Sequence, residues 1–159
     1  MHRLNFNTQH LTINQKIQSI SVWFYKKNYY LQAYSTDING VRDTANNPIH
    51  IVKATESYRL GAEVLETIKE CVFDVPTGNS CDTNGRKIFL KCLGVKSEKQ
   101  LMTEGKLVNI YLVNKKLELC PTSFNSKFMI SEPDNSLHCS LFPDEITQKL
   151  SQAFEQDYQ

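Results

Sequence analysis

The segment IQSISVWFYKKNYYLQAYST, residues 17 to 36, constrains the fold more than any other part of the chain. Ile17 to Tyr25 and Tyr29 to Thr36 are dense in β-branched and aromatic residues, which favour strands. The tripeptide Lys26-Lys27-Asn28 separates the two runs, so the segment predicts a β-hairpin. A chain with such a hairpin builds at least part of its sheet from antiparallel strands.

The same hairpin carries an unusual concentration of aromatic side chains. Because successive side chains in a strand point to opposite faces, the rings are expected to divide about equally between the two faces. We expect one buried face and some aromatic side chains at the surface. The alternative interpretation is that the surface rings anchor a protein partner. The residues concerned are Trp23, Phe24, Tyr29, Tyr30 and Tyr34.

Helix and strand patterns alternate along the rest of the chain. Helical spacing of apolar residues predicts a helix over 57–71, with Ser57 as its N-cap. Gly61 inside this helix suggests close packing against a neighbouring element, since glycine costs about 1 kcal/mol there relative to alanine. A last helix is predicted from Pro143, with Ile146, Leu150, Ala153 and Phe154 turned inward. Further strands are predicted at 49–52, 107–113, 116–120, 127–130 and 137–142.

These patterns predict an α/β (α+β) fold with a partly antiparallel sheet built from hairpins and about three helices. Residues 1–16 are rich in Asn, Gln and Thr and are interpreted as a polar lead-in. Residues 17–159 are expected to form a single domain. The stretches 37–48 and 74–85 are rich in Asp, Asn and Gly and are predicted to be loops.

The segment KCLGVKSEKQL, residues 91 to 101, raises the question of a phosphate-binding loop. Such a loop needs several glycines between a strand and a helix start, whereas Gly94 follows a predicted helix over 85–93, capped by Asn84, and precedes no convincing helix start. We interpret Gly94 as the residue that ends this helix in a left-handed conformation. The inner side of the helix is predicted to carry Ile88, Phe89, Cys92 and Leu93.

Metal and catalytic motifs do not stand out in the sequence. The cysteines, Cys71, Cys81, Cys92, Cys120 and Cys139, form no CxxC pair, and adjacent His138 and Cys139 would point to opposite faces of a strand. His50 alternates with Ile49 and Ile51 and is expected to face solvent. No G-x-S-x-G or H-E-x-x-H motif is present. We therefore expect no metal, no cofactor and no enzymatic activity.

Composition bears on location and on partners. The charge balance of 18 Lys and Arg against 17 Asp and Glu lacks the basic surplus of a dedicated nucleic-acid binder. The beginning of the sequence has no apolar run typical of a signal peptide, and no run is long enough to span a membrane. Five cysteines in such a chain favour reduced thiols. We expect a cytoplasmic protein, with its oligomeric state left open and a homo-oligomer allowed.

Four segments occur together in a familiar order: SYRLGAEVLETIKEC, LGVKSEKQLMTEGKLVNIYLV, LCPT and PDEITQKLSQAFEQ. In this order they resemble the immunity proteins of contact-dependent growth inhibition systems, the CdiI type, over residues 20 to 156. The resemblance implies a cytoplasmic antitoxin of a Gram-negative bacterium, which binds and neutralises the C-terminal toxin domain of a cognate surface-displayed effector. The toxin in such systems is often a nuclease. Family members are inhibitors, so the resemblance implies no catalytic residue, and residues 1–16 have no counterpart in it.

If the toxin is a basic nuclease, acidic loops should face it, because opposite charges steer association. The alternative to this assignment is that loop carboxylates only solvate turns. The candidate toxin-binding residues, all in predicted loops, are Asp37, Asp43, Asp74, Asp82, Glu132 and Asp134.

Two other functions compete with toxin binding. The first is a nucleic-acid- or nucleotide-binding module that uses a basic stripe over residues 86–99, formed by Arg86, Lys87, Lys91, Lys96 and Lys99. The second is an enzyme that depends on a thiol.

Overall fold

The computed structural model describes residues 16–44, 47–76 and 83–156. Nearly all of the predicted lead-in over 1–16 and the candidate Asp82 lie outside these residues. The strands are β1 (Ser19–Tyr25), β2 (Asn28–Ala33), β3 (Ser35–Asp37), β4 (Arg42–Asp43), β5 (Ile49–Lys53), β6 (Val72–Val75), β7 (Lys106–Val113), β8 (Lys116–Phe124), β9 (Met129–Ser131) and β10 (Leu137–Cys139). The helices are α1 (Leu60–Ile68), α2 (Thr83–Leu93), α3 (Glu98–Glu104) and α4 (Pro143–Glu155), with short 3-10 helices η1 (Ala54–Arg59) and η2 (Pro133–Asn135).

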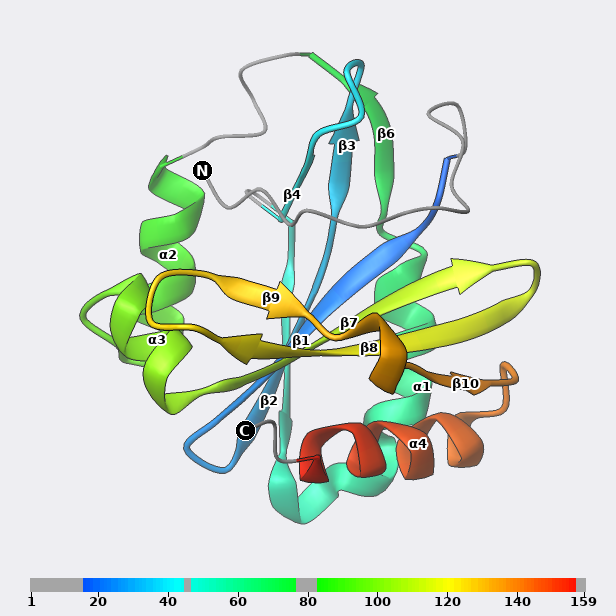
Figure 1. The fold of residues 1–159 in the computed structure, drawn as a ribbon. Coiled ribbons are helices and arrows are strands. Elements are labelled where there is room, and N and C mark those ends of the chain that lie inside the picture. Colours follow the sequence, from blue (N-terminus) through cyan, green and yellow to red (C-terminus); the bar gives the residue numbers. More distant parts are fainter. Residues whose placement is uncertain (1–15, 45–46, 77–82, 157–159) are drawn as a thin grey trace.

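A large antiparallel sheet forms the centre of the molecule (Figure 1). Its strand order is β10-β8-β7-β1-β2-β5, and β9 pairs with the end of β8. A smaller sheet, β4-β3-β6, extends from it and contains the parallel pair β3 and β6. The predicted α+β fold with a partly antiparallel sheet is therefore confirmed. Among the described residues no helix combines the length and apolarity needed to cross a membrane.

The hairpin predicted over 17–36 forms, the strands predicted at 107–113 and 116–120 pair as a second hairpin, and the two share one kind of turn. Lys26 and Lys27 join β1 to β2 with φ of 45° and 65°, and Tyr25 pairs with Asn28. Asn114 and Lys115 join β7 to β8 with φ of 52° and 63°. Positive φ at both central residues is the turn whose twist matches that of the flanking strands. Asn28 therefore begins β2 and is not part of the turn.

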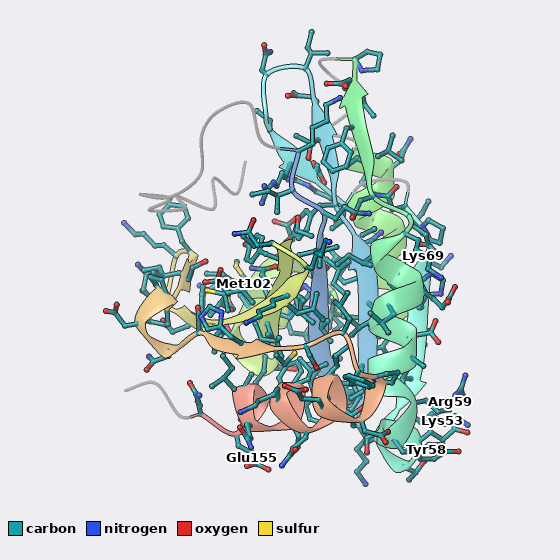
Figure 2. All side chains as sticks on the ribbon, turned by 90° about the vertical axis from the view of Figure 1, so that its right-hand side faces the viewer. Lys53, Tyr58, Arg59, Lys69, Met102 and Glu155 are labelled. Atoms are coloured by element: carbon teal, nitrogen blue, oxygen red, sulfur yellow. The ribbon has the colours of Figure 1, made fainter. Side chains whose placement is uncertain are left out.

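Helices cover both faces of the large sheet. On one face, α1 and α4 pack against a cluster that includes Ile20, Val22 and Leu31 of the first hairpin. On the other face, Leu93 of α2 and Leu101 of α3 pack against side chains that point the opposite way, among them Trp23, Tyr25 and Tyr30. Figure 2 accordingly places Met102 of α3 and Lys69, which follows α1, on opposite sides of the sheet.

This double cover changes the interpretation of the aromatic hairpin. Trp23 and Tyr30 are buried under α2 and α3. Phe24 and Tyr29 pack on Phe154 of α4 on the other face, with ring centroids 6.1 and 5.5 Å away. The expectation of one buried face with surface aromatics was wrong, because each face of this hairpin has its own helical layer.

The predicted helix over 57–71 forms in two parts. Residues 54–59 make the 3-10 helix η1, and α1 begins at Leu60 without a side-chain cap, so Ser57 is not the N-cap. The expected close contact at Gly61 is present, since a Cβ added there would lie 1.8 Å from the carbonyl oxygen of Pro143. The Gly61 N–H donates to Thr147 Oγ1 of α4 at 2.9 Å. Gly61 therefore marks the point where α1 and α4 touch.

The region around Gly94 was predicted in part. Gly94 has φ of 74°, its N–H donates to Lys91 O, and the Val95 N–H donates to Leu90 O, which is the Schellman pattern that ends a helix. A further helix, α3, was missed: it begins after Ser97, whose side chain accepts a hydrogen bond from the Gln100 N–H. The spacing Ser97-x-x-Gln100 is a capping-box signal that was available in the sequence.

The orientation of α2 also differs from the prediction. Its inner side carries Gly85, Phe89 and Leu93, which lie one turn apart, whereas Ile88 is 61% exposed and Cys92 is exposed. Periodicity fixes the relative position of these side chains but not which stripe faces the sheet. The stripe that faces the sheet is the one that contains Gly85, Phe89 and Leu93, and Gly85 and Phe89 line the cavity above the sheet.

Candidate functional site

A cleft lies between α2, α3 and the middle strands of the large sheet. It encloses a cavity of about 150 Å³, the size of a single ring or branched side chain. The floor of the cleft is formed by sheet residues, namely Ser21, Trp23, Gln32 and Leu107. The helical and β9 residues that cover it are Phe89, Leu90, Leu101, Met102 and Met129.

The floor is hollow because a row of polar residues crosses the sheet next to a row of large ones. Gln32, Ser21 and Asn109 are cross-strand neighbours, and all three are buried. The adjacent row consists of Tyr30, Trp23 and Leu107. Ser21 is much smaller than Trp23, so the helices that rest on the larger row leave space above the smaller one.

The buried polar row is held by hydrogen bonds that fix its direction. Gln32 Nε2 donates to Asn47 O at 2.9 Å, and the Tyr34 hydroxyl donates to Asn109 Oδ1 at 2.9 Å. Burial raises the pKa of Tyr34 well above its usual value, so its hydroxyl stays a donor. Asn109 Nδ2 is buried and has no hydrogen-bond partner among the described residues. Polar groups of this kind are costly in a core, and three members of this network, Ser21, Gln32 and Tyr34, line the cleft.

The rim of the cleft bears charges of both signs. Arg86 of α2 lies 3.6 Å from Asp43 of β4 and 3.8 Å from Glu98 of α3, measured between the nearest nitrogen and oxygen atoms. Arg42 stacks over the ring of Tyr111, with 5.6 Å from its guanidinium carbon to the ring centroid. Arg86 thus ties the small sheet to both helices. The rim combines Asp43, a predicted acidic contact, with Arg86, the first member of the predicted basic stripe.

The five acidic candidates that the structure describes do not gather in one place, because three lie in the small sheet and two lie at or next to η2 (Figure 1). Asp37, Asp43 and Asp74 lie in strands of the small sheet and not in loops, contrary to the prediction. Asp74 is an exposed residue whose carboxylate is 2.6 Å from Lys16 Nζ. Glu132 lies between β9 and η2 and accepts a hydrogen bond from Ser123 Oγ at 2.7 Å, while Asp134 is exposed in η2.

Asp37 has a structural environment that the sequence did not reveal. It is 4% exposed, and its Oδ1 accepts hydrogen bonds from the Asn39 and Val41 N–H groups at 2.8 and 2.9 Å. The Asp37 N–H donates to Val41 O, and the Gly40 N–H donates to Asp37 O. The residue therefore closes the turn between β3 and β4, and its carboxylate is not presented to solvent.

We expect Asp37→Ala to destabilise the protein by about 2 kcal/mol, because two backbone donors lose a charged acceptor. Asp37→Asn keeps an oxygen at the same position and should cost less than about 1 kcal/mol. Urea unfolding followed by circular dichroism measures both. Asp134→Ala removes an exposed carboxylate and should change stability by less than about 0.5 kcal/mol. Equal effects of Asp37→Ala and Asp134→Ala would show that the turn does not depend on Asp37.

His50 was predicted to face solvent, but it does not. It points with Val52 toward α1, where Nδ1 lies 3.2 Å from Glu63 and Nε2 lies 2.7 Å from Glu70, while Ile51 is the exposed neighbour. The two carboxylates sit at opposite nitrogens of one ring, so they do not converge on a point where an ion could bind. The arrangement links the edge strand β5 to α1.

Three of the thiols that the structure describes have environments that disfavour the reactive thiolate. Burial raises the pKa of Cys71, of Cys120 and, to about 11, of Cys139. A nucleophilic cysteine needs a lowered pKa, usually from a nearby cation or helix N-terminus. Cys92 was predicted to lie on the apolar side of its helix, but it is exposed on α2. As predicted, His138 and Cys139 point to opposite faces of β10.

The sequence did not predict the cleft itself. Its floor depends on the alignment of Ser21 with Gln32 across two strands, and its cover depends on the orientation of α2. A weak signal was available, since Ser21 interrupts an apolar run and Asn109 interrupts another. Polar residues at inward positions of central strands often mark a site or a specific hydrogen-bond network.

No family model matches the sequence, and no curated protein matches it. Among solved structures, a protein of unknown function from Neisseria meningitidis, NMB0488, matches with a TM-score of 0.69 and 21% identity, over 90% of this chain and 97% of that chain. A chain of the CdiA-CT/CdiI toxin and immunity complex from Yersinia pseudotuberculosis matches with a TM-score of 0.69 and 15% identity, over 87% of this chain and 96% of that chain. At these identities the likeness is one of fold, and the chain shares that fold with both proteins over nearly its whole length.

Proposed function

We propose that this chain is a cytoplasmic immunity protein that binds and neutralises the C-terminal toxin domain of a contact-dependent growth inhibition effector in a Gram-negative bacterium. The observation that carries the proposal is the fold shared with a chain of the CdiA-CT/CdiI toxin and immunity complex, over 87% of this chain. The order of the four sequence segments that resemble CdiI-type proteins points to the same role. The toxin in this proposal is a nuclease, and its inhibitor acts without catalysis.

The chemistry of the described residues fits a binding protein better than a thiol-dependent enzyme. The raised pKa values of Cys71, Cys120 and Cys139 leave these thiols protonated at neutral pH. Arg86, the arginine of the predicted basic stripe for nucleic acid, pairs with Asp43 and Glu98 at the cleft rim and is therefore not presented to a phosphate. The lysines of this stripe remain exposed and need a different explanation.

The acidic candidates remain a proposal for the toxin contact, with different roles. Asp74 and Asp134 are exposed and can meet a partner directly. Asp37 is buried and would act only by shaping the turn that follows it. Asp43 would act at the cleft rim together with Arg86.

The proposal predicts a one-to-one complex with the C-terminal domain of the effector encoded immediately upstream. An inhibitor that must hold a newly delivered toxin needs nanomolar affinity, or about 12 kcal/mol. An interface of about 1,600 Å² is large enough for such a complex. Titration calorimetry measures the affinity and stoichiometry, and coexpression measures rescue of growth. An unrelated toxin domain is the control, and absence of both binding and rescue with the cognate domain would contradict the proposal.

A further inference from the structure

The outer side of α2 and the beginning of α3 carry a group of exposed lysines, which we call the lysine face. Lys87 and Lys91 lie one turn apart on α2, Lys96 lies in the joint after Gly94, and Lys99 lies in the first turn of α3. Figure 1 shows α2 and α3 side by side at one end of the molecule. The lysine face therefore spans two neighbouring helices and the joint between them.

The lysine face is not neutralised by carboxylates of the part of the chain that the structure describes. None of its four lysines has an ion pair within 4.0 Å there, whereas Lys16, Arg59 and Lys69 each have one. The nearby carboxylates are engaged elsewhere. Glu98 pairs with Arg86, and Glu104 accepts a hydrogen bond from the Tyr25 hydroxyl at 3.1 Å. The four positive charges are therefore not compensated within the described residues.

Exposed apolar side chains accompany the lysines. Ile88 is 61% exposed and lies on α2 between Lys87 and Lys91. Phe128 is 54% exposed in the β8–β9 turn. That turn borders the same helices, because Met129 lines the cleft together with Phe89 and Met102.

The β8–β9 turn is held in a fixed shape before any partner binds. Asn125 Oδ1 accepts hydrogen bonds from the Lys127 and Phe128 N–H groups at 3.1 and 2.8 Å. The Asn125 N–H donates to Phe128 O at 3.1 Å. A preorganised turn loses less conformational entropy when it binds a partner, and this favours Phe128 as an anchor residue.

This combination points to a protein partner rather than to a nucleic acid. Phosphate contacts use cations, polar side chains and backbone N–H groups, and a base of single-stranded RNA would stack on an aromatic ring such as that of Phe128. Neither kind of contact uses an exposed aliphatic side chain such as Ile88. A protein interface typically has an apolar centre inside a charged rim. Ile88 lies beside Lys87 and Lys91 on the exposed side of α2 and combines an apolar side chain with charges in this way.

We propose that the lysine face, with Ile88 and Phe128, docks on an acidic and partly apolar surface of the toxin domain. This inference rests on the proposed function and specifies the partner's chemistry. It differs from the expectation that acidic groups of this chain meet a basic toxin. Here the cations lie on this chain and the carboxylates lie on the toxin.

Charge reversal on α2 tests the inference. The variant Lys87→Glu/Lys91→Glu should slow association with the purified toxin domain about tenfold at low salt, because rim charges act mainly on the association rate. The difference in association rate between variant and wild type should shrink to about twofold at 0.5 M NaCl, because salt then screens charges that are more than a few ångströms apart. Stopped-flow fluorescence measures the rates. Ile88→Ser should instead speed dissociation by about fivefold, since it removes an apolar contact.

The matched control is Lys53→Glu/Lys116→Glu, which makes the same change of charge far from α2. Lys53 lies on the α1 side of the molecule (Figure 2), and Lys116 lies at the β7–β8 turn. This variant should associate within about twofold of the wild-type rate. Both variants should keep the wild-type circular dichroism spectrum, because all four lysines are exposed.

The outcomes separate the two proposals. A wild-type protein that does not bind the toxin domain would contradict the proposed function, and this inference with it. Normal binding that Lys87→Glu/Lys91→Glu leaves unchanged at every salt concentration would contradict this inference alone. A third result would also overturn it: a labelled 20-nucleotide RNA that binds the wild type and not this variant, while toxin binding stays unchanged.

Discussion

Replacement of Gly61 by alanine should destabilise the protein by about 3 kcal/mol, although the same change stabilises an unconstrained helix by about 1 kcal/mol. The added Cβ would lie 1.8 Å from the carbonyl oxygen of Pro143 and 2.5 Å from its carbonyl carbon. Both are backbone atoms, so no side-chain rotation relieves the overlap. Either α4 moves away from α1 or the Gly61 hydrogen bond to Thr147 stretches. Urea unfolding followed by circular dichroism measures the loss.

The sign of the change in stability shows whether helix propensity or the contact with Pro143 dominates at Gly61. Ala62→Gly at the next, exposed position is the control and should cost about 1 kcal/mol through helix propensity alone. If Gly61→Ala increased stability, α1 and α4 would not be in contact at this point. Pro143→Ala should not rescue Gly61→Ala, because the overlap involves the backbone of residue 143.

Replacement of Trp23 by alanine should cost about 3 to 5 kcal/mol, the range for a large buried aromatic side chain. Trp23 is 9% exposed and lies under α2 and α3 at the centre of their cluster. Helices of this length are unstable by themselves, so they depend on this contact. We therefore expect amide exchange in α2 and α3 to increase more than in α1 and α4. Trp23→Phe should lose only about 1.5 kcal/mol.

Leu31→Ala is the matched control for Trp23→Ala. Leu31 is fully buried on the opposite face, among the residues that pack against α1 and α4. Its truncation should cost about 2 to 5 kcal/mol but should not selectively expose α2 and α3 to exchange. Hydrogen exchange with mass spectrometry compares the two variants. An identical exchange pattern would mean that the two sheet faces are not separate packing layers.

Local sequence patterns predicted the elements whose structure depends on neighbours in the chain. The runs around Lys26-Lys27 and Asn114-Lys115 are strands on both sides of a two-residue turn, and each forms its hairpin. The closing helix buries the expected Ile146, Leu150 and Phe154. Gly94 ends α2 as predicted. In each case the determining interactions span only a few residues.

The small sheet and the cleft depend on contacts between distant residues. Ser35 pairs with Val72, and Asp37 pairs with Val75, in a parallel arrangement that no local pattern marks. This pairing converts predicted loop residues into strand residues and buries Asp37. Arg86 is likewise turned inward because Asp43 and Glu98 meet it from β4 and α3.

The sequence by itself determined the class of fold, the hairpins, the last helix and the close contact at Gly61, because hydrophobic period, turn residues and glycine placement act locally. Only the tertiary structure decided which stripe of α2 faces the sheet, where the acidic candidates lie and that a cleft exists. Periodicity shows that a helix has an apolar side, but the opposing surface selects that side. In this protein the opposing surface is assembled from strands far apart in the chain, whose register aligns Ser21, Gln32 and Asn109.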